Sequence, residues 1–198
     1  MTPAARSRAH RGRGIRWLAI VLGAAIVAVV GWSAAAGRLP WQLTDAPPPP
    51  VPTAPARPAD AFPLIVERVV DGDTLHATVD GPNETFDIHD SLRIRLIGID
   101  TPEANPAECW SAEATVHLRA LAPEGSVLWG AVDRDPFDRY DRALLYLWTA
   151  QDRFVNLELV TAGDAQTLTV EPNDAHADLF AAAEASAREQ GAGRWGAC

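Results

Sequence analysis

Four acidic residues lie in two short segments that separate runs of aliphatic residues. Asp71 and Asp73 flank a glycine, and Asp100 and Glu103 belong to the tetrapeptide Asp-Thr-Pro-Glu. Carboxylate oxygens without a His or Cys nearby in the sequence favour a hard cation, calcium or magnesium, over a transition metal. The first chemistry that these residues suggest is therefore the binding of a divalent cation.

The same segments also have a simpler explanation. Asp and Gly are favoured in turns for local backbone reasons, so residues 71–73 and residues 100–102 could each be only a turn. If the four acids instead converge, a cation or arginines must offset their repulsion. Arg95, five residues before Asp100, and Arg142, at the end of the run 138–142, are the obvious arginines.

The hydrophobic pattern predicts the elements that must position these residues. Residues 64–70 and 74–80 are rich in β-branched and aliphatic side chains, and the Asp-Gly-Asp between them predicts a hairpin. Residues 91–99 alternate, with aliphatic side chains on one face and Arg93 and Arg95 on the other, which predicts a half-buried third strand. Two further strands are predicted at 127–132 and 143–149.

Helices are predicted at 111–122, 155–162 and 174–190. The element order is then three strands, a helix, two strands and two helices. Five strands with a helix between the third and the fourth suit a small closed barrel of the OB type, in a mainly β fold of the α+β class. Such barrels often bind oligonucleotides, but a fold alone proves no function.

The first sixty residues differ from the rest of the chain. Residues 1–16 contain five arginines, and residues 17–36 contain no charge over about the length that crosses a bilayer. Positive charge before the run predicts a cytoplasmic N-terminus and an extracytoplasmic remainder. The run is either an uncleaved transmembrane anchor, which we favour, or an export signal cleaved at small residues. A buried core helix is disfavoured because the run has no polar face.

Residues 37–60 are rich in proline and predict a stiff polyproline II linker, so the folded domain is expected at 61–198. The net charge of −9 hides an asymmetry, because this domain carries ten arginines, no lysine and 24 acids, which leaves −14. An acidic domain binds nucleic acid poorly by non-specific attraction. Cys109 and Cys198 both fall in the exported part, where we expect them to form a disulfide.

Seven sequence segments recur in one order and together resemble the staphylococcal nuclease family over roughly residues 62–196. They are VVDGDT at 69–74, IRLIGIDTPE at 94–103, Glu113-Ala114, DRYDRALLYLW at 138–148, VNLELVTAGDA at 155–165, EPND at 171–174 and GRW at 193–195. Any one of these segments alone is weak, whereas the ordered set is specific.

The resemblance implies an OB-type barrel with flanking helices and one bound Ca²⁺. The ion would be held by the carboxylates of Asp73 and Asp100 and by the backbone carbonyl of Thr101. The resemblance also implies roles for residues that contact the substrate: Arg95, Glu103 and Arg142 would be catalytic, and Tyr140 would bind the nucleotide.

Two departures from the family pattern bear on substrate binding. Asp141 stands where a glycine is expected, which adds a negative charge beside the phosphate site. Leu168 and Val170 stand where two tyrosines would help bind the nucleotide, and base stacking on such a ring contributes about 1–3 kcal/mol. We therefore expect weak substrate affinity.

The residues and the resemblance together predict a calcium-dependent extracytoplasmic nuclease, tethered to the membrane, that hydrolyses DNA and also RNA as a monomeric domain. One alternative is a catalytically weak nuclease-like binding module at the cell surface, which the domain charge of −14 and the missing tyrosines would favour. Another is a hydrolase of a different phosphodiester or of a cell-envelope polymer. The intact set of catalytic and metal-binding residues favours the nuclease, because a binding module would not need all of it.

Overall fold

The computed structural model describes residues 53–198. The predicted basic tail 1–16, the predicted membrane segment 17–36 and most of the predicted linker 37–60 lie outside the described residues. Within 53–198, no helix is both long enough and apolar enough to cross a membrane.

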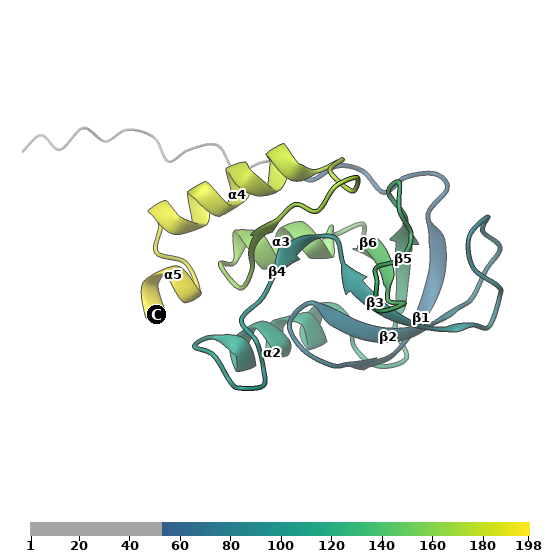
Figure 1. The fold of residues 1–198 in the computed structure, drawn as a ribbon, viewed down its shortest axis with the longest axis horizontal. Coiled ribbons are helices and arrows are strands. Elements are labelled where there is room, and N and C mark those ends of the chain that lie inside the picture. Colours follow the sequence, from purple (N-terminus) through teal and green to yellow (C-terminus); the bar gives the residue numbers. More distant parts are fainter. Residues whose placement is uncertain (1–52) are drawn as a thin grey trace, which may run out of the picture. The chain divides into compact units, whose positions relative to one another are not determined.

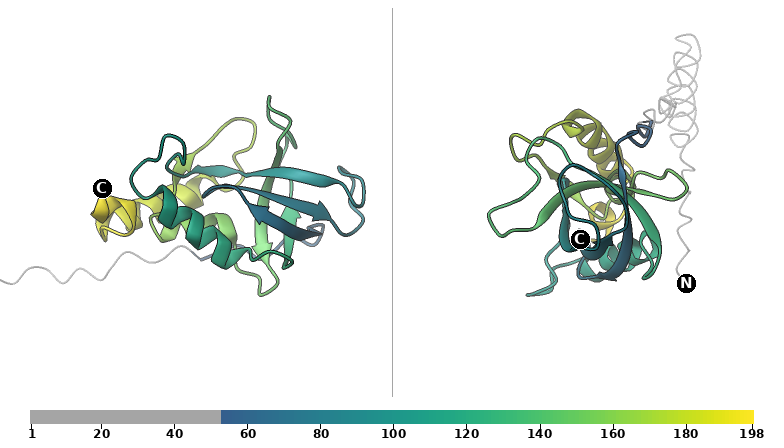
Figure 2. Two further views of the ribbon diagram at one scale, coloured as in Figure 1. Left: turned by 90° about the horizontal axis from the view of Figure 1, so that it is seen from below. Right: turned by 90° about the vertical axis from the view of Figure 1, so that its right-hand side faces the viewer.

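Five strands form a closed barrel, as the sequence predicted. β1 (Phe62–Val69) and β2 (Thr74–Val79) form the antiparallel hairpin, and β3 (Ser91–Leu96) pairs antiparallel with β2. β6 (Ala143–Thr149) runs parallel to β3 and antiparallel to β5 (Val127–Ala131), which returns to β1 and closes the barrel. The right-hand view of Figure 2 looks into this ring of strands.

Alternate residues of the strands fill the barrel, since successive side chains of a strand point to opposite faces. Leu64, Leu75, Ile94 and Leu145 come from four different strands, and each is fully buried. Removing these aliphatic side chains from water is the main favourable contribution to folding. The barrel is thus a packed core, and ligands have to bind on its outside.

Three helices match the predicted ones: α2 (Ser111–Leu121), α3 (Val155–Thr161) and α4 (Ala177–Glu189). Figures 1 and 2 show them gathered at one end of the barrel, with α3 between the barrel and α4. The short helix α5 (Arg194–Ala197) was not predicted, because four residues are too few for a hydrophobic period.

The predicted third strand, 91–99, is in fact two strands. β3 ends at Leu96, Gly98 adopts a φ of +79°, and β4 (Gly98–Asp100) pairs with β7 (Gln166–Leu168) in a separate two-stranded sheet. A Cβ at Gly98 would lie 2.5 Å from the ring of Phe180, so both the backbone and the packing require glycine there. This turn carries Asp100 out of the barrel wall.

The folded part also begins before residue 61, the predicted boundary. The indole of Trp148 donates a hydrogen bond to the Pro55 carbonyl at 3.3 Å. Arg57 forms an ion pair with Asp152 at 3.2 Å, and its guanidinium lies 4.2 Å from the ring centre of Trp129. The end of the proline-rich segment therefore packs on the barrel instead of leaving it directly.

Candidate active site

The turn between β1 and β2 places Asp73 against the loop that follows β4. Asp73 donates a backbone hydrogen bond to the carboxylate of Asp71 at 3.2 Å, which fixes the turn. A Cβ at Gly72 would lie 2.7 Å from Oγ1 of Thr101 and 2.9 Å from Cβ of Ala114. Glycine is needed here because the turn and the loop approach each other too closely for a side chain.

The buried carboxylate of Asp73 joins these two segments. Its Oδ2 accepts hydrogen bonds from the backbone N–H of Thr101 at 2.9 Å and from the Thr101 hydroxyl at 3.0 Å. Its Oδ1 accepts a hydrogen bond from the hydroxyl of Thr74 at 3.1 Å. The fold thus brings together two of the predicted calcium ligands, which are 28 residues apart in the sequence.

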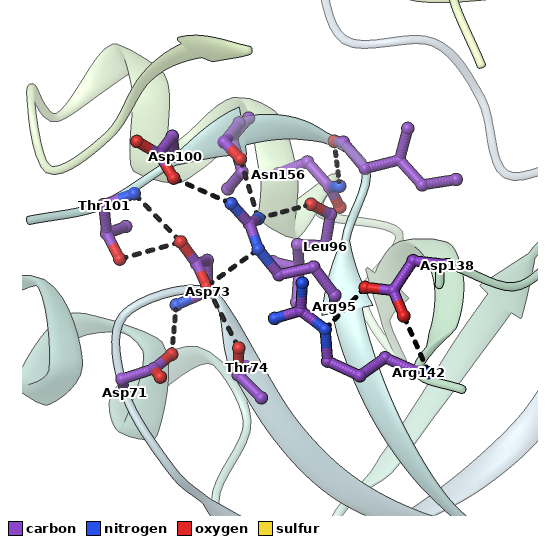
Figure 3. A network of polar contacts seen from close by, with 12 residues as sticks. Asp71, Asp73, Thr74, Arg95, Leu96, Asp100, Thr101, Asp138, Arg142 and Asn156 are labelled. Carbon is purple, nitrogen blue, oxygen red and sulfur yellow. Dashed lines mark hydrogen bonds and ion pairs between the residues drawn. The ribbon is translucent and has the colours of Figure 1, made fainter. Parts of the chain in front are cut away.

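Arg95 links the two predicted metal-binding carboxylates to each other (Figure 3). Its Nε lies 3.2 Å from Asp73, and its Nη2 lies 2.9 Å from Asp100. Its Nη1 donates hydrogen bonds to the carbonyl oxygens of Leu96 and Ile99 at 2.8 and 2.7 Å, which are brought within reach by the turn at residues 97 and 98. Arg95 is only 9% exposed, so the expectation of a solvent-facing side chain holds for Arg93 but not for Arg95.

Two amide side chains that the sequence analysis did not single out support this cluster. Gln166, in β7, donates a hydrogen bond to the other oxygen of Asp100 at 3.2 Å. Asn156, fully buried in α3, donates to the Ile97 carbonyl at 2.9 Å and accepts from the Leu147 N–H at 3.0 Å. Asn156 lies within the segment 155–165 of the family resemblance and Gln166 directly follows it, but nothing in their spacing indicates these contacts.

The donor atoms and the charge of this cluster suit a calcium ion. The carboxylates of Asp73 and Asp100 supply hard oxygen donors, and Asp71 lies beside Asp73 in the turn. Among the described residues only Arg95 forms an ion pair with any of these three acids. Burial raises the pKa of Asp71, and the charge of Asp73 raises this pKa further. No three Asp, Glu, His or Cys side chains of residues 53–198 come together as a metal site. A bound ion would therefore need backbone oxygen and water beside the two carboxylates.

A second arginine is held in the turn that leads into β6. Asp138 accepts hydrogen bonds from the backbone N–H groups of Tyr140 and Arg142, at 2.9 and 3.0 Å, and from Nε of Arg142 at 2.7 Å. Burial alone would raise the pKa of Asp138, but the hydrogen bonds from Arg142 and Tyr140 outweigh it and lower this pKa. Asp138 thus stays charged and fixes the direction of the Arg142 guanidinium.

Asp141 occupies the position where the family pattern expects glycine, and its φ of 60° shows why. The left-handed region costs L-residues about 1–2 kcal/mol, whereas Gly adopts it freely and Asp tolerates it better than most. Asp141 therefore keeps the shape of the turn while adding an exposed carboxylate next to Arg142.

Arg95 and Arg142 meet at one pocket of about 510 Å³ between β3, β4 and the turn before β6. Tyr140 lines the same pocket and is 62% exposed, with its ring centre 5.7 Å from the Arg142 guanidinium. Leu168 and Val170, which replace the expected tyrosines, form an aliphatic part of the wall. Other lining residues include Phe137, on which the sequence analysis made no prediction, and Glu171 and Asn173 of the EPND segment.

Glu103 lies outside this pocket lining. Its side chain is exposed and forms no hydrogen bond or ion pair with any described residue. It follows Thr101, which is bound to Asp73, by two residues in the loop between β4 and α2. At the far end of the same loop, Cys109 forms a disulfide with Cys198.

A small closed barrel carries a carboxylate cluster beside one pocket that three arginines line, Arg95, Arg139 and Arg142. These features define an OB-type protein with a site suited to a cation and an anionic ligand. The sequence model described as "Staphylococcal nuclease homologue" matches residues 93–197, more than half of the chain. The matched range contains Arg95, Asp100, Thr101, Glu103 and Arg142, but not Asp73.

Sequence similarity to individual proteins agrees with the match to this family. The chain is 32% identical to the thermonuclease of Staphylococcus intermedius over 135 residues, which cover 66% of this chain and 74% of that relative. It is 29% identical to the thermonuclease of Staphylococcus hyicus over 128 residues, 63% of this chain and 70% of the relative. It is also 32% identical to endonuclease YhcR of Bacillus subtilis over 142 residues, 66% of this chain and 11% of that longer protein. The chain belongs to the staphylococcal nuclease family.

Proposed function

We propose that this protein is a calcium-dependent, extracytoplasmic nuclease that hydrolyses phosphodiester bonds in DNA and also in RNA. The observation that carries the proposal is the convergence of Arg95 and Arg142 on one pocket, with Arg95 bound at the same time to Asp73 and Asp100. This arrangement places Arg95 and Arg142, together with Arg139 of the same lining, at a pocket next to a pair of hard oxygen ligands. It suits a phosphate group that is also in contact with a divalent cation.

The class of enzyme follows from the family. The relatives are thermonucleases and an endonuclease. The matched range includes Arg95, Arg142 and Glu103. The protein is therefore a phosphodiester hydrolase that acts on nucleic acid.

The arginines bind the phosphate and stabilise the charge that grows on its oxygens in the transition state. Asp138 orients Arg142 by accepting a hydrogen bond from its Nε. The two Nη groups of Arg142 are then available to donate to a phosphate. Arg95 begins with both carboxylates as partners, so it must exchange at least one of these contacts for a phosphate oxygen. Tyr140 offers an exposed ring beside Arg142 on which a base can stack.

Glu103 is the group that orients or deprotonates the attacking water, and its exposed carboxylate is free to do so. Calcium, when held by Asp73, Asp100 and the Thr101 carbonyl, supplies Lewis-acid polarisation of the phosphoryl oxygen. The loop through Thr101 therefore connects the cation ligands to the water-activating residue.

We place the domain outside the cytoplasm, on a membrane anchor at 17–36 with a linker to residue 60. The uncharged run after five arginines supports this placement, and the Cys109–Cys198 disulfide is typical of an oxidising compartment. We expect the domain to act as a monomer.

A catalytically weak binding module at the cell surface is the second candidate. It is favoured by the domain charge of −14 and by aliphatic residues at the two expected tyrosine positions of the pocket. Such a module would bind an oligonucleotide in chelator as well as in calcium.

Hydrolysis of supercoiled plasmid and of a single-stranded oligonucleotide by the full chain, in calcium and in chelator, tests the proposal. Cleavage should need calcium, and a Glu103→Gln variant should lose on the order of 10²-fold or more in rate while keeping its fold. Near wild-type cleavage by Glu103→Gln would remove Glu103 from the mechanism. Absence of cleavage by the wild type, together with tight binding in chelator, would favour the binding module.

A further inference from the structure

The loop between β4 and α2, residues 101–110, carries Glu103 and is fixed near both of its ends. At its start, Thr101 is bound to Asp73 through its backbone N–H and its hydroxyl. At its end, the indole of Trp110 donates a hydrogen bond to the buried carboxylate of Asp164 at 2.7 Å. Glu103 itself lies in the exposed middle part, where the barrel and helices do not cover it.

Glu103 is tied within the loop to Glu108. Its backbone N–H donates to the Glu108 carboxylate at 3.1 Å, and its carbonyl accepts from the Glu108 N–H at 2.9 Å. Ala104 and Ala107 form a β-bridge between them. The loop is therefore a miniature hairpin whose two ends are Glu103 and Glu108. Glu108 therefore supports the backbone of Glu103 through two hydrogen bonds.

The residue after Glu108 is Cys109, which the disulfide attaches to Cys198 in the last turn of the chain. Cys198 donates a backbone hydrogen bond to Arg194 at 3.0 Å, and Arg194 donates one to Gly163 at 3.0 Å. Gly163 precedes Asp164, the residue that holds Trp110 and is also bound to His117 of α2 at 2.5 Å. The disulfide thus closes a ring of contacts that runs from the miniature hairpin through α5 and back to the end of the loop.

We propose that the Cys109–Cys198 disulfide positions Glu103, so that the hydrolytic reaction depends on the oxidised state of the two cysteines. The inference rests on the proposed function, in particular on the role of Glu103. Cys109, Cys198 and Glu108 are positioning residues, because each would act on the reaction only through the backbone of Glu103. In the reduced protein Glu103 keeps its chemistry but loses the support of its hairpin.

The switching reaction is thiol–disulfide exchange. A dithiol reductant gives two electrons and two protons to the S–S bond, which breaks into two thiols, and the reductant becomes a disulfide. A cytoplasm kept reducing would hold the enzyme in its weak form, and an oxidising compartment would activate it. The direction fits a hydrolase that would otherwise attack nucleic acid before export.

A disulfide that spans 89 residues also stabilises a fold, so the experiment must separate positioning from stability. The full chain is assayed oxidised and after reduction with dithiothreitol, with thiols counted by mass spectrometry and the fold checked by circular dichroism at the assay temperature. Reduction should lower kcat on the order of tenfold and leave KM within about twofold, as expected for a misplaced catalytic group. Unchanged kcat in fully reduced, folded protein would overturn the proposal.

A double-mutant cycle then asks whether the effect passes through Glu103. In the Glu103→Gln background, reduction should change the residual kcat by less than about twofold, because the group being positioned is already disabled. An equal loss in both backgrounds would assign the disulfide a general stabilising role and overturn the proposal. Oxidised wild type without any nuclease activity would instead count against the proposed function.

A second variant keeps the disulfide and therefore decides the matter if the reduced protein unfolds. Glu108→Ala removes the carboxylate that accepts from the Glu103 N–H, and Glu108 is exposed, so folding should be kept. It should lower kcat several-fold in the oxidised protein with KM and the unfolding midpoint unchanged. Glu124→Ala, an exposed acid beyond the other end of α2 that forms no ion pair with described residues, is the matched control and should keep wild-type kcat. Wild-type kcat in Glu108→Ala would overturn the proposal.

Discussion

Arg95 and a calcium ion should compete for the same carboxylates, and this competition can be measured as stability. Arg95→Met keeps most of the side-chain stem but removes the guanidinium that joins Asp73 to Asp100. The carboxylates of Asp73 and Asp100 then lose the positive charge that pairs with them. In chelator the variant should be destabilised, and calcium should restore stability because the ion takes over the role of the guanidinium.

The size of the effect follows from burial. The Asp73 and Arg95 side chains are 9% and 11% exposed, so their contact counts as a buried pair, whereas Asp100 is 33% exposed and its pair is screened by water. Breaking a buried ion pair costs about 3–5 kcal/mol. Because water screens the pair with Asp100, we expect Arg95→Met to lose unfolding free energy at the low end of this range, about 3 kcal/mol. Calcium at 100 times its dissociation constant would return about 2.7 kcal/mol to the variant.

Urea unfolding in chelator and in saturating calcium measures both quantities. Calcium should raise the unfolding free energy of Arg95→Met by about 1 kcal/mol or more beyond its effect on the wild type, in which the ion must first displace Arg95. Arg93→Met, on the exposed face of the same strand, is the control and should change neither quantity. Equal calcium effects in wild type and Arg95→Met would refute the reasoning that the ion and Arg95 share these carboxylates.

Three further outcomes are expected. Asp141→Gly should tighten binding of a single-stranded oligonucleotide, measured by fluorescence anisotropy, because it removes an acid beside Arg142 and relieves a φ of 60°; unchanged affinity would show that this acid does not face the substrate. The logarithm of affinity of Glu103→Gln should depend weakly on the logarithm of salt, with a slope for about two to three phosphate contacts, and a steep slope would indicate a broader binding surface. Burial lowers the pKa of His176 in the folded protein. As the pH falls below about 6.5, the unfolded chain therefore takes up a proton at this residue before the folded protein does. The unfolding free energy should then decline until the pH reaches the pKa of His176 in the folded protein. Unfolding midpoints of His176→Phe should show less of this decline, and an identical pH profile would contradict it.

The sequence by itself predicted the barrel, because the barrel depends on local patterns, and it predicted candidate site residues through the family resemblance. Alternating aliphatic residues specify which face of a strand is buried, and Asp-Gly-Asp between two such strands specifies a hairpin. The ordered segments of the resemblance were enough to identify the family, and Arg95, Asp100 and Arg142 followed from them by position.

The ends of the elements were harder to predict, and Gly98 is the instructive case. Residues 91–96 alternate, and the alternation stops at the aliphatic pair Leu96-Ile97 before Gly98. A glycine in a strand pattern indicates a bulge as readily as the end of a strand, so this signal alone does not separate β3 from β4. The break comes from Phe180, whose ring occupies the space that a Cβ at Gly98 would need, and from pairing with β7 some seventy residues later. Long-range packing of this kind decides what a local signal such as Gly98 means.

Only the tertiary structure shows which side chains of the site contact one another. The alternation placed Arg95 on the solvent-facing side of its strand, yet the turn at Gly98 brings Asp100 and two carbonyl oxygens over it and buries it. Two cysteines in an exported chain permit a disulfide, but only the fold puts Cys198 beside the loop that carries Glu103. Sequence patterns report the neighbours of a residue along its own element. Contacts between elements depend on where the chain turns. At this site the turn between β1 and β2 and the turn at Gly98 bring Asp73, Arg95 and Asp100 together.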